Sequence, residues 1–350
     1  MRPGAPAWKT HAMLLDLTDR QAHALFGSMY AVATLGGTEA LSEMAASAIE
    51  SLAVVGLGCA PVDPGGLAGG TTDALGGALS SAEEAGAAVE ILAVTSLVDG
   101  ALDAGRIELV LDYAGALAVH EHWLEDLAAS RAADLGPVIA DMGGRNLVSI
   151  SDGRVDPAKV DDIDAWLMPY KGDREDPALA ARYRSLADAD PATLGGAFYA
   201  FYDRHGFSFP GEPDAANEIF TTPHDCTHLL SGYDTTPQGE LLVSTFTARM
   251  HPWFPMEGHI LPVIYSWHLG IEFNSLAGSY RGALDPAKFW VAWDRGLSMG
   301  IDTFSEAFDF WRLADEPLEG LRDLSGVVAL DPAFAASSDA VAGVDYRPIA

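Results

Sequence analysis

The chain has 350 residues, of which 49% are hydrophobic and 9% aromatic, so it holds enough apolar material for two folded domains and is not disordered. Its formal net charge of −30, from 50 acidic and 20 basic residues, excludes a basic nucleic-acid surface as the default interpretation. No apolar run reaches the roughly 18 residues of a membrane span, and two cysteines cannot build a disulfide framework, so we predict a cytoplasmic protein without an integral membrane segment.

The chemistry of the chain is uneven along its length. Six of its ten histidines lie between His205 and His268, and we place a domain boundary near Asp152, which gives domains 1–150 and 151–350. The N-terminal segment has no sustained apolar run, so no signal peptide is predicted. The abundance of alanine and glycine suggests a GC-rich bacterial genome.

The first domain is predicted to consist of short helices without strands. Thr18 can cap a helix that runs to about Thr34, and Thr38 can cap a second that reaches Val55. A Gly-rich loop follows, with the sequence PVDPGGLAGGTTDALGG.

The next helix begins with an S-x-x-E capping box, formed by Ser81 and Glu84, and ends at Asp99-Gly100. Another helix opens near Asp103, and the amphipathic segment EHWLEDLAAS is the last of this domain. We expect a turn-rich connector over residues 140–195, with GGRN, SDGR, DPAK and KGDREDP as turns and ARYRSLADAD as a helix within it.

The block AAVEILAVTSLVDGALDAGRIELVLDYAGALAV joins two helices through a DG turn and an acidic spacer. It resembles the tellurite-resistance TerB-like helical domain, and the likeness covers residues 15–135. The resemblance implies a helical domain whose acidic turn is sometimes proposed to bind metal, here through Asp99 and Asp103. We favour the interpretation that these two acids end and cap helices.

A short segment of the second domain carries two histidines at helical spacing. Thr222 and Pro223 are predicted to start a helix that Gly232 ends. His224 and His228, four residues apart on that helix, share one face and can hold one divalent metal ion.

Two carboxylates accompany these imidazoles. Asp225 is a third ligand, a partner of a ligating imidazole or a base acting on metal-bound water, and the sequence leaves these alternatives open. Thr236 and Pro237 start the next helix after a short link, which turns Glu240 back toward the two histidines. This donor set fits one divalent ion of Zn, Fe, Mn or Co.

The order His-Asp-x-x-His, eleven residues and then Glu matches the HDxxH-x11-E signature of the coenzyme Q biosynthesis protein 4 family. The segment ATLGG followed by FYAFY, upstream of the motif, is also similar to that family, and the likeness runs over residues 157–311. The resemblance implies an all-α domain with a divalent metal on His224, Asp225, His228 and Glu240, and an apolar cavity for a prenylated or quinone-like ligand. It implies replacement of a ring carboxyl by a hydroxyl, and an organising role among biosynthetic enzymes.

Other residues of the second domain receive weaker assignments. His268 and Glu272 are four apart, and we favour a buried hydrogen-bonded pair over a second metal pair or a proton relay lining the site. His259 is expected to face the cavity, and His205 to lie at the surface. His251 is eleven residues beyond the glutamate of the motif, on the order of 16 Å along a helix, which is too far to share its metal.

Tryptophan, phenylalanine and tyrosine recur at helical spacing through the second domain, which predicts core packing and also suits a pocket for a flat substrate. Cys226, offset from the histidine face, is predicted to be a small buried residue rather than a ligand.

We therefore predict an all-α protein of two helical domains, the second a metal-binding helical bundle. The leading hypothesis is a metal-dependent enzyme, decarboxylase- or oxygenase-like, with Asp225 and Glu240 as catalytic groups and a small apolar or aromatic molecule or lipid as substrate. The alternatives are a metal-dependent hydrolase and a non-catalytic lipid-binding or scaffold protein with a structural metal. A homo-oligomer or a biosynthetic-enzyme complex is the expected assembly.

Overall fold

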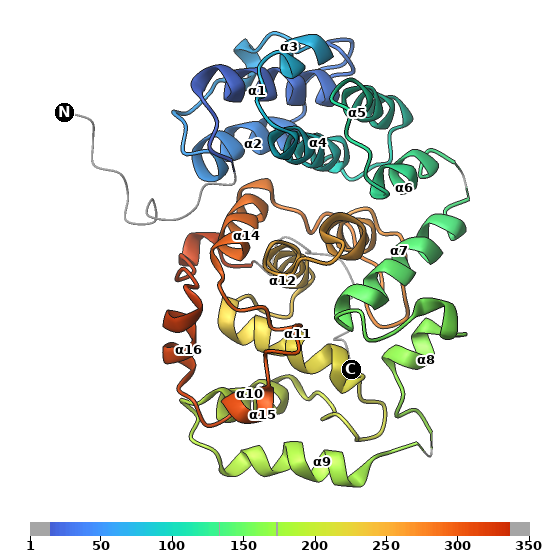
Figure 1. The fold of residues 1–350 in the computed structure, drawn as a ribbon, viewed down its shortest axis with the longest axis vertical. Helices are drawn as coiled ribbons and strands as arrows, with labels where there is room; N and C mark the ends of the chain where they lie inside the picture. The colour runs from blue at the N-terminus through green and yellow to red at the C-terminus, as the bar shows by residue number, and fades with distance from the viewer. Residues whose placement is uncertain (1–14, 133, 173, 337–350) are drawn as a thin grey trace, which may run out of the picture. The chain divides into compact units, whose positions relative to one another are not determined.

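The computed structural model describes residues 15–132, 134–172 and 174–336. Its regular structure is helical, with sixteen α-helices and no β-strand among these described residues (Figure 1). The predicted all-α fold is confirmed. None of the helices in the described ranges combines the length and the apolar character that crossing a membrane requires.

The chain divides into two compact units. The first comprises the described residues up to Asp141 together with Leu284–Asp294, and the second comprises Met142–Ala283 and the described residues from Arg295 onward. The division therefore falls inside one helix, α7 (Gly136–Ile150), and a segment from late in the chain joins the first unit.

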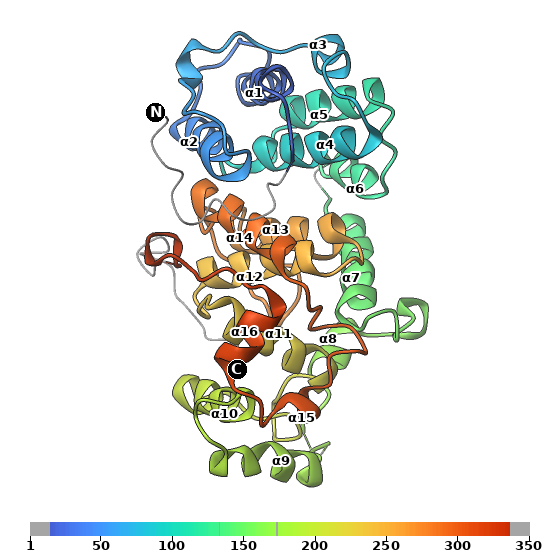
Figure 2. The same ribbon diagram turned by 60° about the vertical axis from the view of Figure 1, so that its left-hand side comes forward.

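The first unit is built around a long, buried helix. α4 packs against both α1 and α5, and most of its residues are buried (Figure 2). Burial of so many apolar side chains is the main stabilising contribution to this unit. Its helices are α1 (Asp19–Ala33), α2 (Glu43–Ser51), α3 (Thr72–Gly76), α4 (Ala82–Leu97), α5 (Ala104–Ala116) and α6 (Trp123–Ala129).

Four helix starts in this unit are predicted from capping residues, and the structure confirms three of them. Thr18 caps α1, the Ser81 hydroxyl accepts from the backbone of Glu84 at the start of α4, and Asp103 caps α5. Asp99 forms an ion pair with Arg106. These contacts account for the two acids of the turn as helix-terminal residues.

The fourth predicted start is wrong. Thr38 does not cap a helix, because it lies in the turn after α1 and its hydroxyl donates to the Leu35 carbonyl at 2.9 Å. Gly36 and Gly37, both with positive φ, carry the chain through that turn. The helix begins instead at Glu43, with Ser42 as its cap.

The expected connector is also wrong in part, because the GGRN sequence lies inside α7. A Cβ on Gly143 would lie 3.4 Å from Ile163 and one on Gly144 3.6 Å from Pro157, which are ordinary contact distances, so the packing does not require glycine at either position. The helix predicted over 181–190 is shifted towards the N-terminus, since the Asp176 side chain caps it there.

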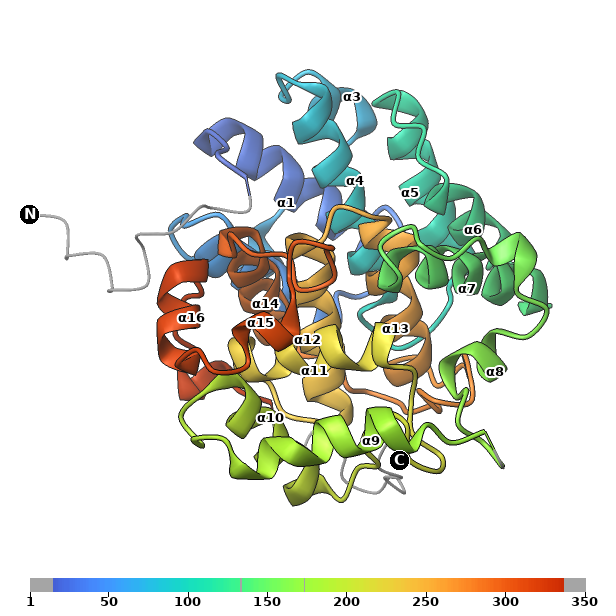
Figure 3. The same ribbon diagram turned by 60° about the horizontal axis from the view of Figure 1, so that its bottom comes forward.

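The second unit contains the remaining helices, of which α14 begins in the first unit. α11 packs against α10 and α12, and α12 packs against α13, which brings the histidine motif into the middle of this unit (Figure 3). The helices are α7, α8 (Ile163–Leu167), α9 (Pro177–Arg184), α10 (Leu194–His205), α11 (Glu218–Ser231), α12 (Pro237–Met250), α13 (Leu261–Trp267), α14 (Pro286–Ser298), α15 (Phe310–Leu313) and α16 (Leu318–Ser325).

Candidate metal centre

The helix that carries the two histidines begins earlier than the sequence predicts. α11 starts at Glu218, and the Asn217 side chain caps it by accepting from the Ile219 N–H at 3.0 Å. Pro223 therefore lies inside the helix instead of opening it. The i, i+4 relation of the histidines is unaffected, because the residues around Pro223 remain helical.

The turn and helix start that bring in the glutamate follow the prediction. Gly232 ends α11 with φ of 82°, and Thr236 caps α12 by accepting from the Gly239 N–H at 3.1 Å. Gly239 is required there, because a Cβ would collide with the carbonyl oxygen of Asp234. Glu240 then falls in the first turn of α12 and points at the histidines.

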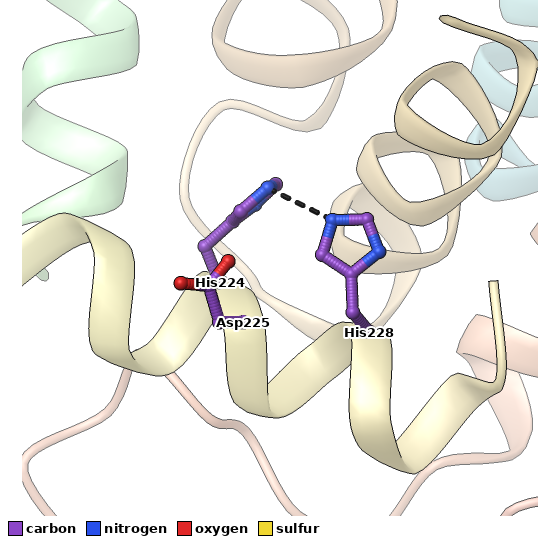
Figure 4. Close-up of side chains that lie close together, drawn as sticks. All are labelled: His224, Asp225 and His228. Atoms are coloured by element: carbon purple, nitrogen blue, oxygen red, sulfur yellow. Dashed lines mark hydrogen bonds between the residues drawn. The ribbon is translucent and has the colours of Figure 1, made fainter. Parts of the chain in front are cut away.

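Three donor atoms form a nearly equilateral triangle. The Nε2 atoms of His224 and His228 lie 3.1 Å apart (Figure 4). Glu240 Oε2 lies 3.1 Å from the first of these atoms and 3.3 Å from the second. Two donors bound to one ion at about 2.0–2.1 Å in a tetrahedral arrangement are about 3.3–3.4 Å apart. The spacing is therefore close to that of three ligands of one metal ion.

Hydrogen bonding between neutral imidazoles does not account for every side of this triangle. The Nδ1–H of His228 donates to the Tyr233 carbonyl at 3.0 Å, so the neutral ring presents an unprotonated Nε2 to its neighbours. That lone pair faces both His224 Nε2 and a carboxylate oxygen of Glu240. Either a proton on His228 or a cation is needed between these atoms, and a backbone partner on the far nitrogen is the usual arrangement of a metal-ligating histidine.

The electrostatics of the cluster favour positive charge. Burial lowers the pKa of His228, but the charge and hydrogen bond of Glu240, together with Asp225, outweigh it and raise that pKa to about 9. Burial likewise raises the pKa of Glu240, but the two histidines outweigh it and lower that pKa to about 2. These shifts favour an ionised Glu240 carboxylate beside a protonated His228 imidazole.

Asp225 is fixed beside the histidines by hydroxyl groups. Its Oδ2 accepts from Tyr202 at 2.6 Å and from Thr221 at 2.9 Å. It also lies close to both imidazoles, because one ligand atom from each of the three side chains, His224, Asp225 and His228, lies within 4.8 Å of the other two. Burial raises the pKa of the Asp225 carboxyl. The sequence analysis missed Tyr202 and Thr221 as partners, although Thr221 is four residues before Asp225 on the same helix.

A cavity of about 120 Å³ adjoins the cluster. His224, Asp225 and Glu240 line it, whereas His228 lies behind them and is fully buried. Most of the remaining lining is apolar, and none of the described lining residues is a lysine or an arginine. The apolar lining includes Ile150, Leu167, Phe220, Val263, Trp267 and Phe304.

His259 also lines this cavity, and its hydrogen bonds define its tautomer. The Ser149 hydroxyl donates to the Trp253 carbonyl at 2.9 Å and lies 2.6 Å from His259 Nε2. A hydroxyl has one proton, so His259 must donate its Nε2–H to Ser149. Burial, with the nearby imidazoles of His251 and His224, lowers the pKa of His259 to about 3, so this ring is neutral.

The prediction that His268 and Glu272 form a buried hydrogen-bonded pair on one helix is wrong. α13 ends at Trp267, and Gly270 with φ of 74° turns the chain out of the helix. His268 is buried, Glu272 is exposed, and neither lines the cavity.

The remaining assigned side chains have local structural partners. His251 contacts Asp302 and the Ser149 carbonyl. His205, expected at the surface, is half-buried, with its Nδ1 2.8 Å from the carbonyl of Phe201. Cys226 is fully buried, and burial raises the pKa of its thiol.

The sequence analysis missed a second group of donors in the first unit. Ligand atoms of His122, Asp126 and Asp141 lie within 4.8 Å of one another, and His122 Nδ1 is 3.5 Å from an oxygen of Asp141. The spacing of four between His122 and Asp126 was the available signal. Two members of this group, His122 and Asp141, are partly exposed, whereas His224 alone is so among His224, Asp225 and His228.

Comparisons with protein-family models, with curated proteins and with solved structures find no match for this chain. The two family resemblances therefore stay predictions. The assignment of this site rests on its own geometry.

Proposed function

We propose that this protein is a metal-dependent enzyme that acts on a small aromatic or quinone-like molecule. The observation that carries the proposal is the triangle of donor atoms from His224, His228 and Glu240 at the wall of an apolar cavity. An oxidative decarboxylation or hydroxylation of the ring, which the family resemblance implies, is the reaction we favour.

The three donors fit one divalent ion of Zn, Fe, Mn or Co, with Asp225 as a fourth ligand or as a carboxylate beside it. Such an ion polarises a carbonyl or carboxylate oxygen and, if it is Fe(II), activates dioxygen. His228 would hold it from the buried side, and His224 and Glu240, which both line the cavity, from the cavity side.

The position of the cavity favours catalysis over a structural role for the metal. Structural zinc sites are closed by four protein ligands, whereas catalytic sites keep a position open to substrate. Here His224 and Glu240 both border the cavity. A molecule in the cavity would therefore reach the ion, which supports an enzyme rather than a scaffold.

Asp225 is the candidate proton-carrying group. It lines the cavity, and burial raises its pKa above the ordinary value of a carboxyl, which is the direction that favours carrying a proton. Tyr202 and Thr221 hold one of its oxygens in place by hydrogen bonds. The apolar lining excludes bulk water, which strengthens each of these electrostatic interactions.

The lining also supports an uncharged substrate over a phosphorylated one. Without a lysine or arginine among the described lining residues, a phosphate would meet two carboxylates and no cation except the metal. This disfavours the phosphohydrolase alternative. The native metal, the assembly with itself or with a biosynthetic enzyme, and a cytoplasmic location stay predictions.

The test is elemental analysis by plasma mass spectrometry of the purified protein. We expect about one equivalent of metal in the parent, and its loss in His228→Ala and in Glu240→Ala. His205→Ala is the matched control, since His205 is a half-buried histidine outside the cluster, and it should retain the metal. A folded parent that takes up no metal when Zn, Fe, Mn and Co are added back would refute the proposal.

A further inference from the structure

Three buried threonine hydroxyl groups in the helices around the cavity bond to their own helix. Thr245 and Thr247 of α12 donate to carbonyls four residues earlier at 2.8 and 2.9 Å, and Thr227 of α11 does the same at 2.8 Å. Ser266 of α13 differs. It is only 2% exposed, and its hydroxyl has no hydrogen-bond partner among the described residues.

An unpaired buried hydroxyl destabilises a folded protein, so its presence needs a physical reason. Ser266 lies on the wall of the cavity beside the candidate metal centre. Pro262, Val263 and Trp267 line the same cavity, so one face of α13 forms part of its wall. The unpaired hydroxyl therefore belongs to a residue that lines the space a ligand would fill.

A second polar group lies on the same wall. His259, seven residues before Ser266, donates its Nε2–H to Ser149, which leaves Nδ1 as an unprotonated acceptor with no hydrogen bond from the described residues. Between these two residues the wall is apolar, with Pro262 and Val263. The wall thus offers one unpaired hydroxyl and one acceptor nitrogen to a cavity whose lining residues are mostly apolar.

Size and charge restrict the ligand further. A cavity of about 120 Å³ is comparable with the engineered apolar cavity of about 150 Å³ that binds benzene, so it has room for one ring. Asp225 and Glu240 border the space, and no lysine or arginine does so among the described lining residues. The polar atom that meets Ser266 is therefore neutral, as in a phenol, an alcohol or a carbonyl.

We propose that Ser266 is a ligand-binding residue whose hydroxyl forms a hydrogen bond with a neutral oxygen atom of a single-ring molecule held in the cavity. This inference deepens the proposed function and rests on it for the role of that molecule as a substrate. Binding through Ser266 does not itself require the metal.

The probes are phenol and toluene, which have nearly the same size and differ by one hydroxyl. Binding of each is measured by calorimetry or NMR titration on the full chain after dialysis against EDTA. Ser266→Ala should weaken phenol binding by about 3- to 10-fold, the effect of one neutral hydrogen bond, and leave toluene binding unchanged. Ser96→Ala, which removes a buried hydroxyl bonded to its own helix at 2.7 Å, should change neither.

A second readout shows whether the hydroxyl has a structural role. Ser96→Ala should lower the melting temperature of the metal-free protein, because it breaks a hydrogen bond, whereas Ser266→Ala should leave that temperature unchanged or raise it. Equal weakening of phenol and toluene by Ser266→Ala, or no binding of either probe to the parent, would overturn the inference. A parent that takes up no metal when Zn, Fe, Mn and Co are added back, but that shows the phenol-specific loss in Ser266→Ala, would refute the proposed function and leave this inference intact.

Discussion

The charge state of the histidine cluster predicts how the stability of the metal-free protein depends on pH. His228 has a pKa of about 9 in the folded protein, against about 6.5 in the unfolded chain. Between these values the folded state holds one more proton than the unfolded state, so stability must fall as pH rises. The contribution is fully present below pH ~6.5 and is lost as pH rises through about 9.

The size of this effect follows from the shift. A difference of about 2.5 units at about 1.4 kcal/mol per unit gives about 3 kcal/mol as an upper value. Glu240, with its pKa lowered to about 2, reports the same interaction from the acid side, so the two shifts are not added. Its contribution is present above the unfolded pKa of about 4.3 and is lost as pH falls through about 2.

The assay is denaturant unfolding of EDTA-treated protein at several pH values from 6 to 10, with His228→Gln as the matched variant. The free energy of unfolding of the parent, minus that of the variant, should fall by about 3 kcal/mol across this range. A bound metal takes the place of the proton on His228 Nε2, so the metal-loaded parent should not show this fall in the free energy of unfolding with rising pH. A difference that stays flat with pH in the metal-free protein would show that His228 carries no proton there and would refute the reasoning.

Three further substitutions test local features. Gly239→Ala should destabilise the protein by about 2 kcal/mol or more in denaturant unfolding, because its Cβ would collide with backbone. Gly86→Ala in α4, where an added Cβ would meet nothing within 4 Å, should instead stabilise it by about 0.5–1 kcal/mol. Tyr202→Phe removes a hydrogen bond to the buried aspartate of the motif and should lower the free energy of unfolding by about 1–3 kcal/mol, with the metal content retained. Ser42→Ala should cost about 1 kcal/mol through loss of the α2 cap, and an equal cost for Thr38→Ala would contradict the observed helix start.

The candidate metal centre could be predicted from the sequence because its signals are local. His224 and His228 share a face through helical spacing, and Thr236 with Pro237 marks the helix start that places Glu240. All five residues lie within 17 positions of the chain. Short loops between helices leave few ways to arrange such neighbours, so the sequence pattern is enough.

The errors arose where contacts distant in sequence decide the structure. Thr222 and Pro223 carry a strong local start signal, but α11 begins at Glu218, with Asn217 as its cap. The Asn217 side chain donates to the Trp166 carbonyl at 2.9 Å, and its backbone N–H donates to the Leu167 carbonyl at 2.8 Å. These bonds to a segment about 50 residues earlier fix Asn217 as the cap. Local propensity could not reveal them.

The same reasoning applies to residues that the sequence could not assign. Trp290 joins the first unit through a hydrogen bond of 3.1 Å to the Ala48 carbonyl, across 242 positions of the chain. The role inferred for Ser266 depends on what its hydroxyl does not contact, which no sequence pattern encodes. A serine near the end of an apolar helix predicts only a polar side chain that needs a partner.

Charge balance supports the proposal that the cluster holds a divalent ion. Asp225 and Glu240 carry two negative charges when ionised, and both are buried beside two imidazoles. A proton on His228 compensates one of these charges, and the raised pKa of Asp225 is consistent with the other remaining poorly compensated. A divalent cation compensates both and leaves the imidazoles neutral, as ligation requires. The cluster therefore combines the donor spacing of a divalent metal site with an excess of negative charge. A variant that removes one carboxylate should weaken metal binding even where the histidines are unchanged.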